Sequence, residues 1–127
     1  MPAATISIMV IESHPLMRAA LCAAIADEPG LTIVAVAADV ADIMQAAKLL
    51  QPDIVLMALG KPGTDEMKAL QLLRKKLPAA SILTLTNDEA PEQKQAALDH
   101  GAQATLAQNA PRSELLGALR LLSHTRH

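Results

Sequence analysis

The sequence of 127 residues contains no phenylalanine, tyrosine or tryptophan. Without aromatic rings the chain has no platform on which nucleic-acid bases or a flavin ring could stack, so its core must consist of aliphatic side chains and methionine. The only cysteine is Cys22. One cysteine excludes both an internal disulfide and a zinc site built on thiolates.

Charge and long hydrophobic runs are also scarce. Charged residues make up 19% of the chain, the net charge is −2, and the one dense basic cluster is residues 74–76, which we interpret as the solvated end of a helix. No apolar run approaches the roughly 18 residues that a membrane-spanning helix needs, and the N-terminus carries no signal-peptide pattern. We therefore expect a cytoplasmic chain that binds neither membranes nor, by itself, nucleic acid.

What the chain does have is apolar segments in regular alternation. Apolar residues make up 51% of the sequence, enough for one domain over residues 1–127. Segments with helical spacing separate five runs typical of strands buried on both faces. These runs are residues 5–11, 31–37, 53–58, 81–86 and 103–107. Pro15 and Asp39 suit helix starts. The pattern predicts a single three-layer α/β domain, a doubly wound parallel sheet with helices on both faces.

In such a fold, ligands gather at the carboxyl ends of the strands. The residues expected there are mostly uncharged: they are Glu12, Ser13, Ala58, Thr86, Asn87 and Gln108. With a single carboxylate and no cationic side chain, this set predicts neither an acid–base pair nor a built metal site. We expect no enzyme activity from it.

Several motifs occur in one register along nearly the whole chain. They are IESHPLMR at 11–18, EPGL at 28–31, PDIVLM at 52–57, KPGTD at 61–65, ILTLT at 82–86 and HGA at 100–102. This series resembles the receiver domains of two-component response regulators, and most closely their NarL/LuxR-type subclass. The resemblance implies a flavodoxin-like (βα)5 sheet with strand order 2-1-3-4-5.

The resemblance also implies a chemistry that this chain lacks the residues to perform. In the family, a histidine kinase passes a phosphoryl group to an aspartate at the end of the third strand, beside Mg²⁺ held by an acidic pair. The matching position is Ala58, whose side chain has no oxygen and cannot act as a nucleophile. The acidic pair is reduced to Glu12 and Ser13, which together with the carbonyl of Gly60 would hold Mg²⁺ weakly or not at all. We expect no cofactor, and Glu12 is at most a weak metal ligand.

Other positions of the family's pocket depart as well. The switch threonine is kept as Thr86, but Asn87 follows it in place of a small residue, Thr105 replaces the aromatic residue of the fifth strand, and Gln108 replaces the conserved lysine. The resemblance therefore implies a degenerate pseudo-receiver that takes part in signal transduction and transcription regulation through phosphorylation-independent contacts.

Partners and chain boundaries follow from the same resemblance. A homodimer or a protein partner is expected, and the last predicted helix offers a candidate surface. Its leucines are Leu115, Leu116, Leu119 and Leu122, with the alternative that all four are core. The subclass usually continues into a helix-turn-helix DNA-binding domain, which is absent from this chain. The chain is then either an excised receiver or a stand-alone one.

Two other functions stay open at this point. One is an ordinary two-component receiver that carries an engineered block at Ala58. The other is a small flavodoxin-like ligand-binding domain, although the first strand is not followed by a glycine-rich phosphate loop.

Overall fold

The computed structural model describes residues 5–59, 64–86 and 91–124, and strands and helices alternate along them. The strands are β1 (Ile6–Ile11), β2 (Leu31–Ala37), β3 (Ile54–Ala58), β4 (Ser81–Thr86) and β5 (Ala104–Ala107). The helices are α1 (Pro15–Ala26), α2 (Val40–Leu50), α3 (Thr64–Lys76), α4 (Pro91–Asp99) and α5 (Arg112–His124). Every predicted strand is present, with bounds that differ by one residue at most.

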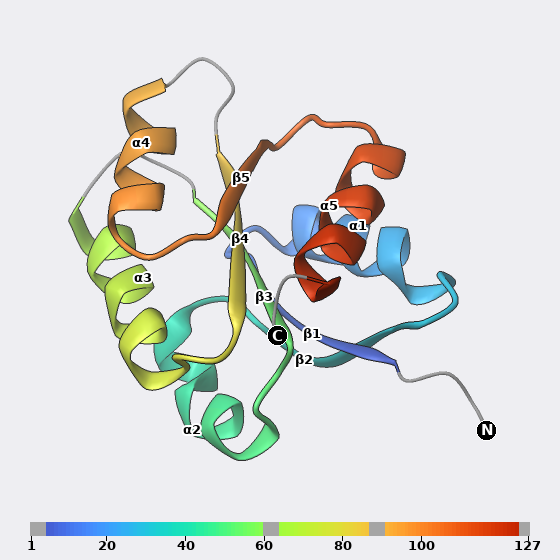
Figure 1. The fold of residues 1–127 in the computed structure, drawn as a ribbon, viewed down its shortest axis with the longest axis horizontal. Helices are drawn as coiled ribbons and strands as arrows, with labels where there is room; N and C mark the ends of the chain where they lie inside the picture. The colour runs from blue at the N-terminus through green and yellow to red at the C-terminus, as the bar shows by residue number, and fades with distance from the viewer. Residues whose placement is uncertain (1–4, 60–63, 87–90, 125–127) are drawn as a thin grey trace.

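All strand pairs are parallel, and the sheet order is β2-β1-β3-β4-β5. Figure 1 shows the sheet between two helical layers, with α2, α3 and α4 on one face and α1 and α5 on the other. The predicted doubly wound, flavodoxin-like fold is therefore confirmed. Since the chain order reverses between β1 and β3, the carboxyl ends of these two strands form the switch point at which such folds bind ligands.

Two core clusters, one on each face of the sheet, explain the apolar strands. Met9 and Met57 belong to the cluster beneath α2, α3 and α4, whereas Val10 and Leu56 belong to the cluster beneath α1 and α5. Successive side chains of a strand point to opposite faces, so a strand covered on both sides needs apolar residues at every position. The core contains no aromatic side chain because the sequence has none.

Helix starts follow the sequence signals. Pro15 is the first residue of α1, where its missing N–H is not needed, and the Nδ1 atom of His14 accepts a hydrogen bond from the Met17 N–H at 3.4 Å. At α2, the Oδ1 atom of Asp39 accepts one from the Asp42 N–H at 3.0 Å. Residues 61–63 of the KPGTD motif lie outside the described residues.

The prediction that the leucines of α5 form a partner surface is wrong. The four leucines proposed for it are all buried in the cluster beneath α1 and α5: Leu115, Leu116, Leu119 and Leu122. Their spacing of one, three and three residues keeps them on the helix face that meets the sheet, so at most 8% of each residue is exposed and the alternative that all four are core holds. The exposed leucine of this helix is Leu121, which is 65% exposed.

An ion-pair network joins α5 to the segment that follows α1. The Glu28 carboxylate pairs with Arg120 at 2.7 Å and with Arg112 at 3.2 Å, and Arg112 also donates to the Ala24 carbonyl. The hydrogen bond from Arg120 is the main reason that the pKa of Glu28 lies below its usual value of 4.5, and the charges of both arginines add to it. The network therefore contributes stability only while Glu28 is ionised.

Glu28→Gln should flatten the acid side of the stability profile. A carboxyl group with a lowered pKa in the folded state stabilises the fold above the unfolded pKa, and this contribution is lost as the pH falls through the folded pKa. Thermal melts followed by far-UV circular dichroism between neutral and acid pH measure the effect. Glu114→Gln, at an exposed acidic residue of α5, is the matched control. Equal acid sensitivity in wild type and Glu28→Gln would contradict the assignment.

Arg74 corrects a second expectation. Instead of ending α3 in solvent, its guanidinium donates to the carbonyls of Leu77 at 2.6 Å and Ala80 at 2.5 Å, and to the Gln103 side chain at 2.9 Å. A longer bond of 3.3 Å reaches the Gly101 carbonyl. Partial burial in this setting lowers the pKa of Arg74 from its usual value. This side chain therefore fastens α3 to the segments that precede β4 and β5.

Candidate functional site

Polar and small side chains collect at the carboxyl edge of the sheet. Glu12 and Ser13 follow β1, Ala58 ends β3, Thr86 ends β4 and Gln108 follows β5. The structure thus brings these predicted residues to one edge. Gly60 and Asn87, the two other residues predicted from the ends of β3 and β4, lie outside the described residues.

Ala58 occupies an apolar position within the sheet. It pairs with Leu85 of β4 and is 7% exposed, and it belongs to the core cluster beneath α1 and α5. The next residue continues the contact, since the Leu59 N–H donates to the Leu85 carbonyl at 2.8 Å. A methyl group here provides packing and no acid, base or nucleophile.

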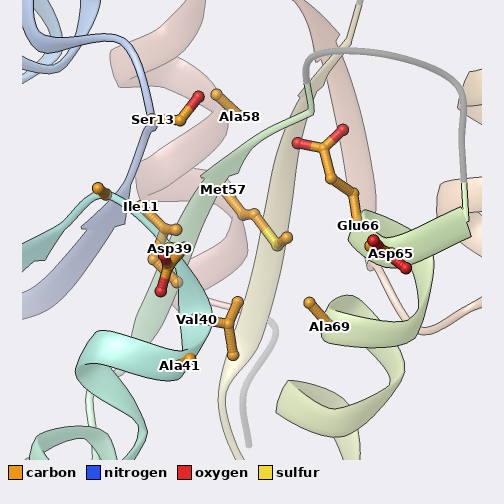
Figure 2. A pocket seen from close by; sticks show the side chains of 11 residues that line it. Ile11, Ser13, Asp39, Val40, Ala41, Met57, Ala58, Asp65, Glu66 and Ala69 are labelled. Atoms are coloured by element: carbon orange, nitrogen blue, oxygen red, sulfur yellow. The ribbon is translucent and has the colours of Figure 1, made fainter.

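Glu12 is buried, with 8% of its surface exposed, and its polar atoms serve the start of α1. The Oε2 atom accepts a hydrogen bond from the His14 N–H at 3.1 Å, and the backbone carbonyl accepts one from Arg18 at 2.9 Å. Ser13, in contrast, is exposed and lines the same cavity as Ala58 (Figure 2). One carboxylate oxygen of Glu12 is therefore already engaged within the protein.

The two threonines at the family's switch positions lie on neighbouring strands. Thr86 is fully buried, and its hydroxyl donates to the Leu106 carbonyl at 3.4 Å. Thr105 on β5 is half-buried and pairs with Thr84, whose buried hydroxyl has no hydrogen-bond partner among the residues that the structure describes. Sequence reasoning missed Thr84, because a threonine inside a strand is ordinary for a sheet.

Gln108 links three strand ends. Its side-chain amide donates to the Leu59 carbonyl at 2.9 Å, and its backbone N–H donates to the Thr86 carbonyl at the same distance. A hydrogen bond to a carbonyl beyond β3 needs a donor at this position but no positive charge. Glutamine therefore acts here as a neutral brace between the segment after β5 and the end of β3.

Gln108→Ala should lower the free energy of unfolding by about 1 kcal/mol, the usual net value of one hydrogen bond. Urea unfolding followed by far-UV circular dichroism measures the change. The neighbouring Asn109 is also exposed, so Asn109→Ala serves as the control. If the two variants lost the same free energy of unfolding, the bracing role of Gln108 would be contradicted.

A cavity of about 380 Å³ opens beside Ala58, between the ends of β1 and β3 and the first turns of α2 and α3. Figure 2 shows the residues that line it: Ile11, Ser13, Ala38, Asp39, Val40, Ala41, Met57, Ala58, Asp65, Glu66 and Ala69. Sequence reasoning treated Asp39 only as a helix start and did not single out Asp65 or Glu66. Only the topology, which brings the starts of two helices beside the switch point, places them together.

The described residues hold neither a clustered metal site nor a membrane-spanning helix. They contain no group of three or more His, Cys, Asp or Glu side chains that could hold a metal ion. Within the same ranges, no helix has the length and apolar character needed to cross a bilayer. That Glu12 is at most a weak metal ligand remains a prediction.

Comparisons with known proteins agree with this architecture. The family model named response regulator receiver domain matches residues 8–120. The nitrate/nitrite response regulator protein NarP of Escherichia coli is 33% identical over 121 residues, which cover 94% of this chain and 56% of that protein. For the nitrate/nitrite response regulator protein NarL of Escherichia coli K12, the identity is 29% over 113 residues, covering 89% and 52%. The chain therefore spans about half the length of these curated relatives.

A solved structure gives the same result in three dimensions. The two-component response regulator of the LuxR family from Aurantimonas sp. superposes with a TM-score of 0.85 and 29% identity. The match covers 98% of this chain and 89% of that one.

Proposed function

The chain belongs to the response regulator receiver domain family of two-component signalling, and from that membership we propose that it is a receiver that signals without accepting a phosphoryl group. Receiver domains are signalling modules, and we expect no enzyme activity from this one. The degenerate pocket comprises Glu12, Ser13, Ala58, Gly60, Thr86, Asn87, Thr105 and Gln108.

The observation that carries the proposal is the set of internal contacts made by these residues. Ala58 packs in the core, the Glu12 carboxylate accepts from the start of α1, and the Thr86 hydroxyl donates to β5. Gln108 donates to the carbonyl of Leu59 at the end of β3, so it supplies a neutral amide where the family has a lysine. The pocket thus serves packing and bracing, which supports a fixed receiver.

The donor set does not fit Mg²⁺ well. This ion is usually held by one or two carboxylates together with substrate phosphates and water. Here the Ala58 side chain offers no oxygen, and one oxygen of the Glu12 carboxylate already accepts from a backbone N–H. We expect weak or no binding of Mg²⁺.

Such a receiver would signal through contacts with a second copy or with another protein. The relatives are about twice as long, and the NarL/LuxR-type subclass carries a DNA-binding domain after the receiver. We propose that this chain sets the geometry of such a regulator in transcription control, with no nucleic-acid contact of its own. A cytoplasmic location stays a prediction.

Incubation with acetyl phosphate and Mg²⁺, followed by intact-mass spectrometry, tests the proposal. We expect no species heavier by one phosphoryl group, whereas a receiver with an aspartate at this position should gain one under the same conditions. A phosphorylated species of this chain would contradict the proposal, and peptide mapping would then give the new acceptor.

The alternative of an ordinary receiver blocked only at Ala58 is tested by Ala58→Asp under the same conditions. If the rest of the pocket were intact, this single change would restore phosphorylation. We expect that it does not, because Ser13 and Gln108 still lack the negative and positive charges that hold the ion and the phosphoryl group. Efficient phosphorylation of Ala58→Asp would favour the blocked receiver.

A further inference from the structure

The face that α4 turns to the sheet consists of polar and small side chains. Its buried residues are Gln93, which is 2% exposed, and Ala97, while Leu98 is 43% exposed. Each of the other helices buries at least one isoleucine, leucine or methionine among its described residues, for example Ile25 on α1 and Leu70 on α3. Because apolar burial is the main force that holds a helix on a sheet, α4 is the helix with the weakest hold.

The sheet surface beneath α4 is polar as well. This helix lies over β4 and β5 at one end of its layer, with α3 as its helical neighbour (Figure 1). Leu83 and Leu85 belong to the cluster beneath α1 and α5, so the alternation of side chains along β4 turns Thr84 and Thr86 to the opposite face. Thr105 pairs with Thr84 in the register of β4 and β5 and faces the same way. Three threonines therefore lie on the face of these strands that α4 covers.

The Thr84 hydroxyl is the weakest point of this interface. It is fully buried and has no hydrogen-bond partner among the residues that the structure describes. Thr86 differs, because its hydroxyl donates to the Leu106 carbonyl. A buried polar group without a partner has lost its hydrogen bonds to water, and it regains them when the structure around it opens. Since α4 covers this strand face, movement of α4 away from the sheet would let water reach the Thr84 hydroxyl.

The C-terminal end of α4 is held more firmly. The Ala102 N–H donates to the Ala97 carbonyl at 3.0 Å, and Ala102 is buried in the cluster beneath α2, α3 and α4. Arg74 donates to the Gly101 carbonyl at 3.3 Å, and Gly101 packs closely on the aliphatic part of the same side chain. Residues 100–102 are therefore the point about which α4 can turn while β5 stays in place.

We propose that α4 opens away from the sheet as a separate unit, turning about residues 100–102, while the sheet and the other helices stay folded. The opened form exposes the threonine face of β4 and β5. A partner that binds this face only when α4 is open would shift the protein toward the open form. That regulatory step rests on the proposed function, whereas the opening itself does not.

Native-state hydrogen exchange of the ¹⁵N-labelled protein, measured by nuclear magnetic resonance at low concentrations of urea, tests the opening. We expect the amides of residues 95–99 to be at least about tenfold less protected than the most protected amides of α3 and α5, because a local opening costs less free energy than global unfolding. Their exchange should also depend less on urea, since the opening of one helix exposes little surface. Equal protection of the three helices would overturn the proposal, and so would an equal dependence on urea.

A matched pair of variants tests whether the buried hydroxyl promotes the opening. Thr84→Val replaces the unpartnered hydroxyl by a methyl group of about the same size, so it should raise the protection of the α4 amides about tenfold. Thr86→Val makes the same change two residues away but removes a hydroxyl that has a partner, so α4 should gain no protection. Unchanged protection of α4 in Thr84→Val, or equal effects of the two variants, would show that α4 only frays as a short helix and would overturn the proposal.

The acetyl phosphate experiment and the hydrogen-exchange experiment fail independently. A phosphorylated protein whose α4 still opens as a separate unit would refute the proposed function alone. A protein that stays unphosphorylated and whose α4 opens only when the whole fold unfolds would refute this inference alone.

Discussion

Ala58→Asp should lower the free energy of unfolding by about 2 to 3 kcal/mol at neutral pH in metal-free buffer. Ala58 is 7% exposed and packs among apolar side chains, so a carboxylate placed there loses much of its hydration. It would also share the strand edge with the buried Glu12, and two neighbouring carboxylates repel each other. Urea unfolding followed by far-UV circular dichroism measures the loss.

The dependence of this penalty on pH and charge identifies its cause. As the pH falls and the introduced carboxyl group takes up a proton, the difference from wild type should shrink, because a neutral acid costs less to bury. Ala58→Asn, which has the same shape without the charge, should lose less stability than Ala58→Asp. An unchanged or higher stability of Ala58→Asp would show that the pocket still tolerates an acid and is not structural.

Arg74→Ala should lower the free energy of unfolding by about 3 kcal/mol. The guanidinium donates to the carbonyls of Leu77 and Ala80 and to the side chain of Gln103, all at 2.9 Å or less. Removing it leaves several partly buried acceptors without this donor, and each unsatisfied group costs about 1 kcal/mol or more. Urea unfolding of the variant tests the value.

Two further variants distinguish the effect of the Arg74 hydrogen bonds on stability from the effect of positive charge at the end of α3. Arg74→Lys should be intermediate, because an ammonium group does not reproduce the planar fork of donors. Lys75→Ala, at an exposed position of the same helix, should change stability by less than about 0.5 kcal/mol. If the Arg74→Ala loss matched that of Lys75→Ala, the residue would be the solvated helix end that its sequence context suggests.

Gly101 packs against the same arginine. Its φ angle of 125° lies in the region that favours glycine, and a Cβ atom there would lie 2.8 Å from the Arg74 Cβ and Cγ atoms. The close approach lets the backbone after α4 run over the aliphatic part of Arg74. Sequence motifs place a glycine at this position but do not reveal which side chain requires it.

The sequence pattern was sufficient to predict the strands and a doubly wound parallel sheet, and the resemblance to receiver domains supplied the strand order. Strands buried on both faces need apolar residues at every position, and alternation with helical segments leaves few topologies for a parallel sheet. The helix starts at Pro15 and Asp39 were equally accessible, because capping is a local interaction. Such features depend on residues that are close together in the chain.

The features that the sequence did not predict depend on distant segments. Helical periodicity showed that α5 has an apolar face, but only the sheet beneath it decides that Leu115 and Leu119 leave nothing for a partner. Arg74 and Gln108 reach carbonyls on other elements, which composition and spacing do not encode. Asp39, Asp65 and Glu66 likewise line one cavity because the starts of α2 and α3 are adjacent only in the folded chain.

A titration with Mg²⁺ and then beryllofluoride, followed by ¹⁵N nuclear magnetic resonance, tests most directly whether the receiver pocket has become structural. Beryllofluoride mimics a phosphoryl group on an aspartate. Nuclear magnetic resonance is the suitable readout because this chain has no tyrosine or tryptophan whose fluorescence could report binding. The amides of Glu12, Ser13 and Thr86 should stay still, and sedimentation of the same sample should show an unchanged oligomeric state. Saturable shifts of these amides would contradict a pocket that no longer binds the ion or the phosphoryl group.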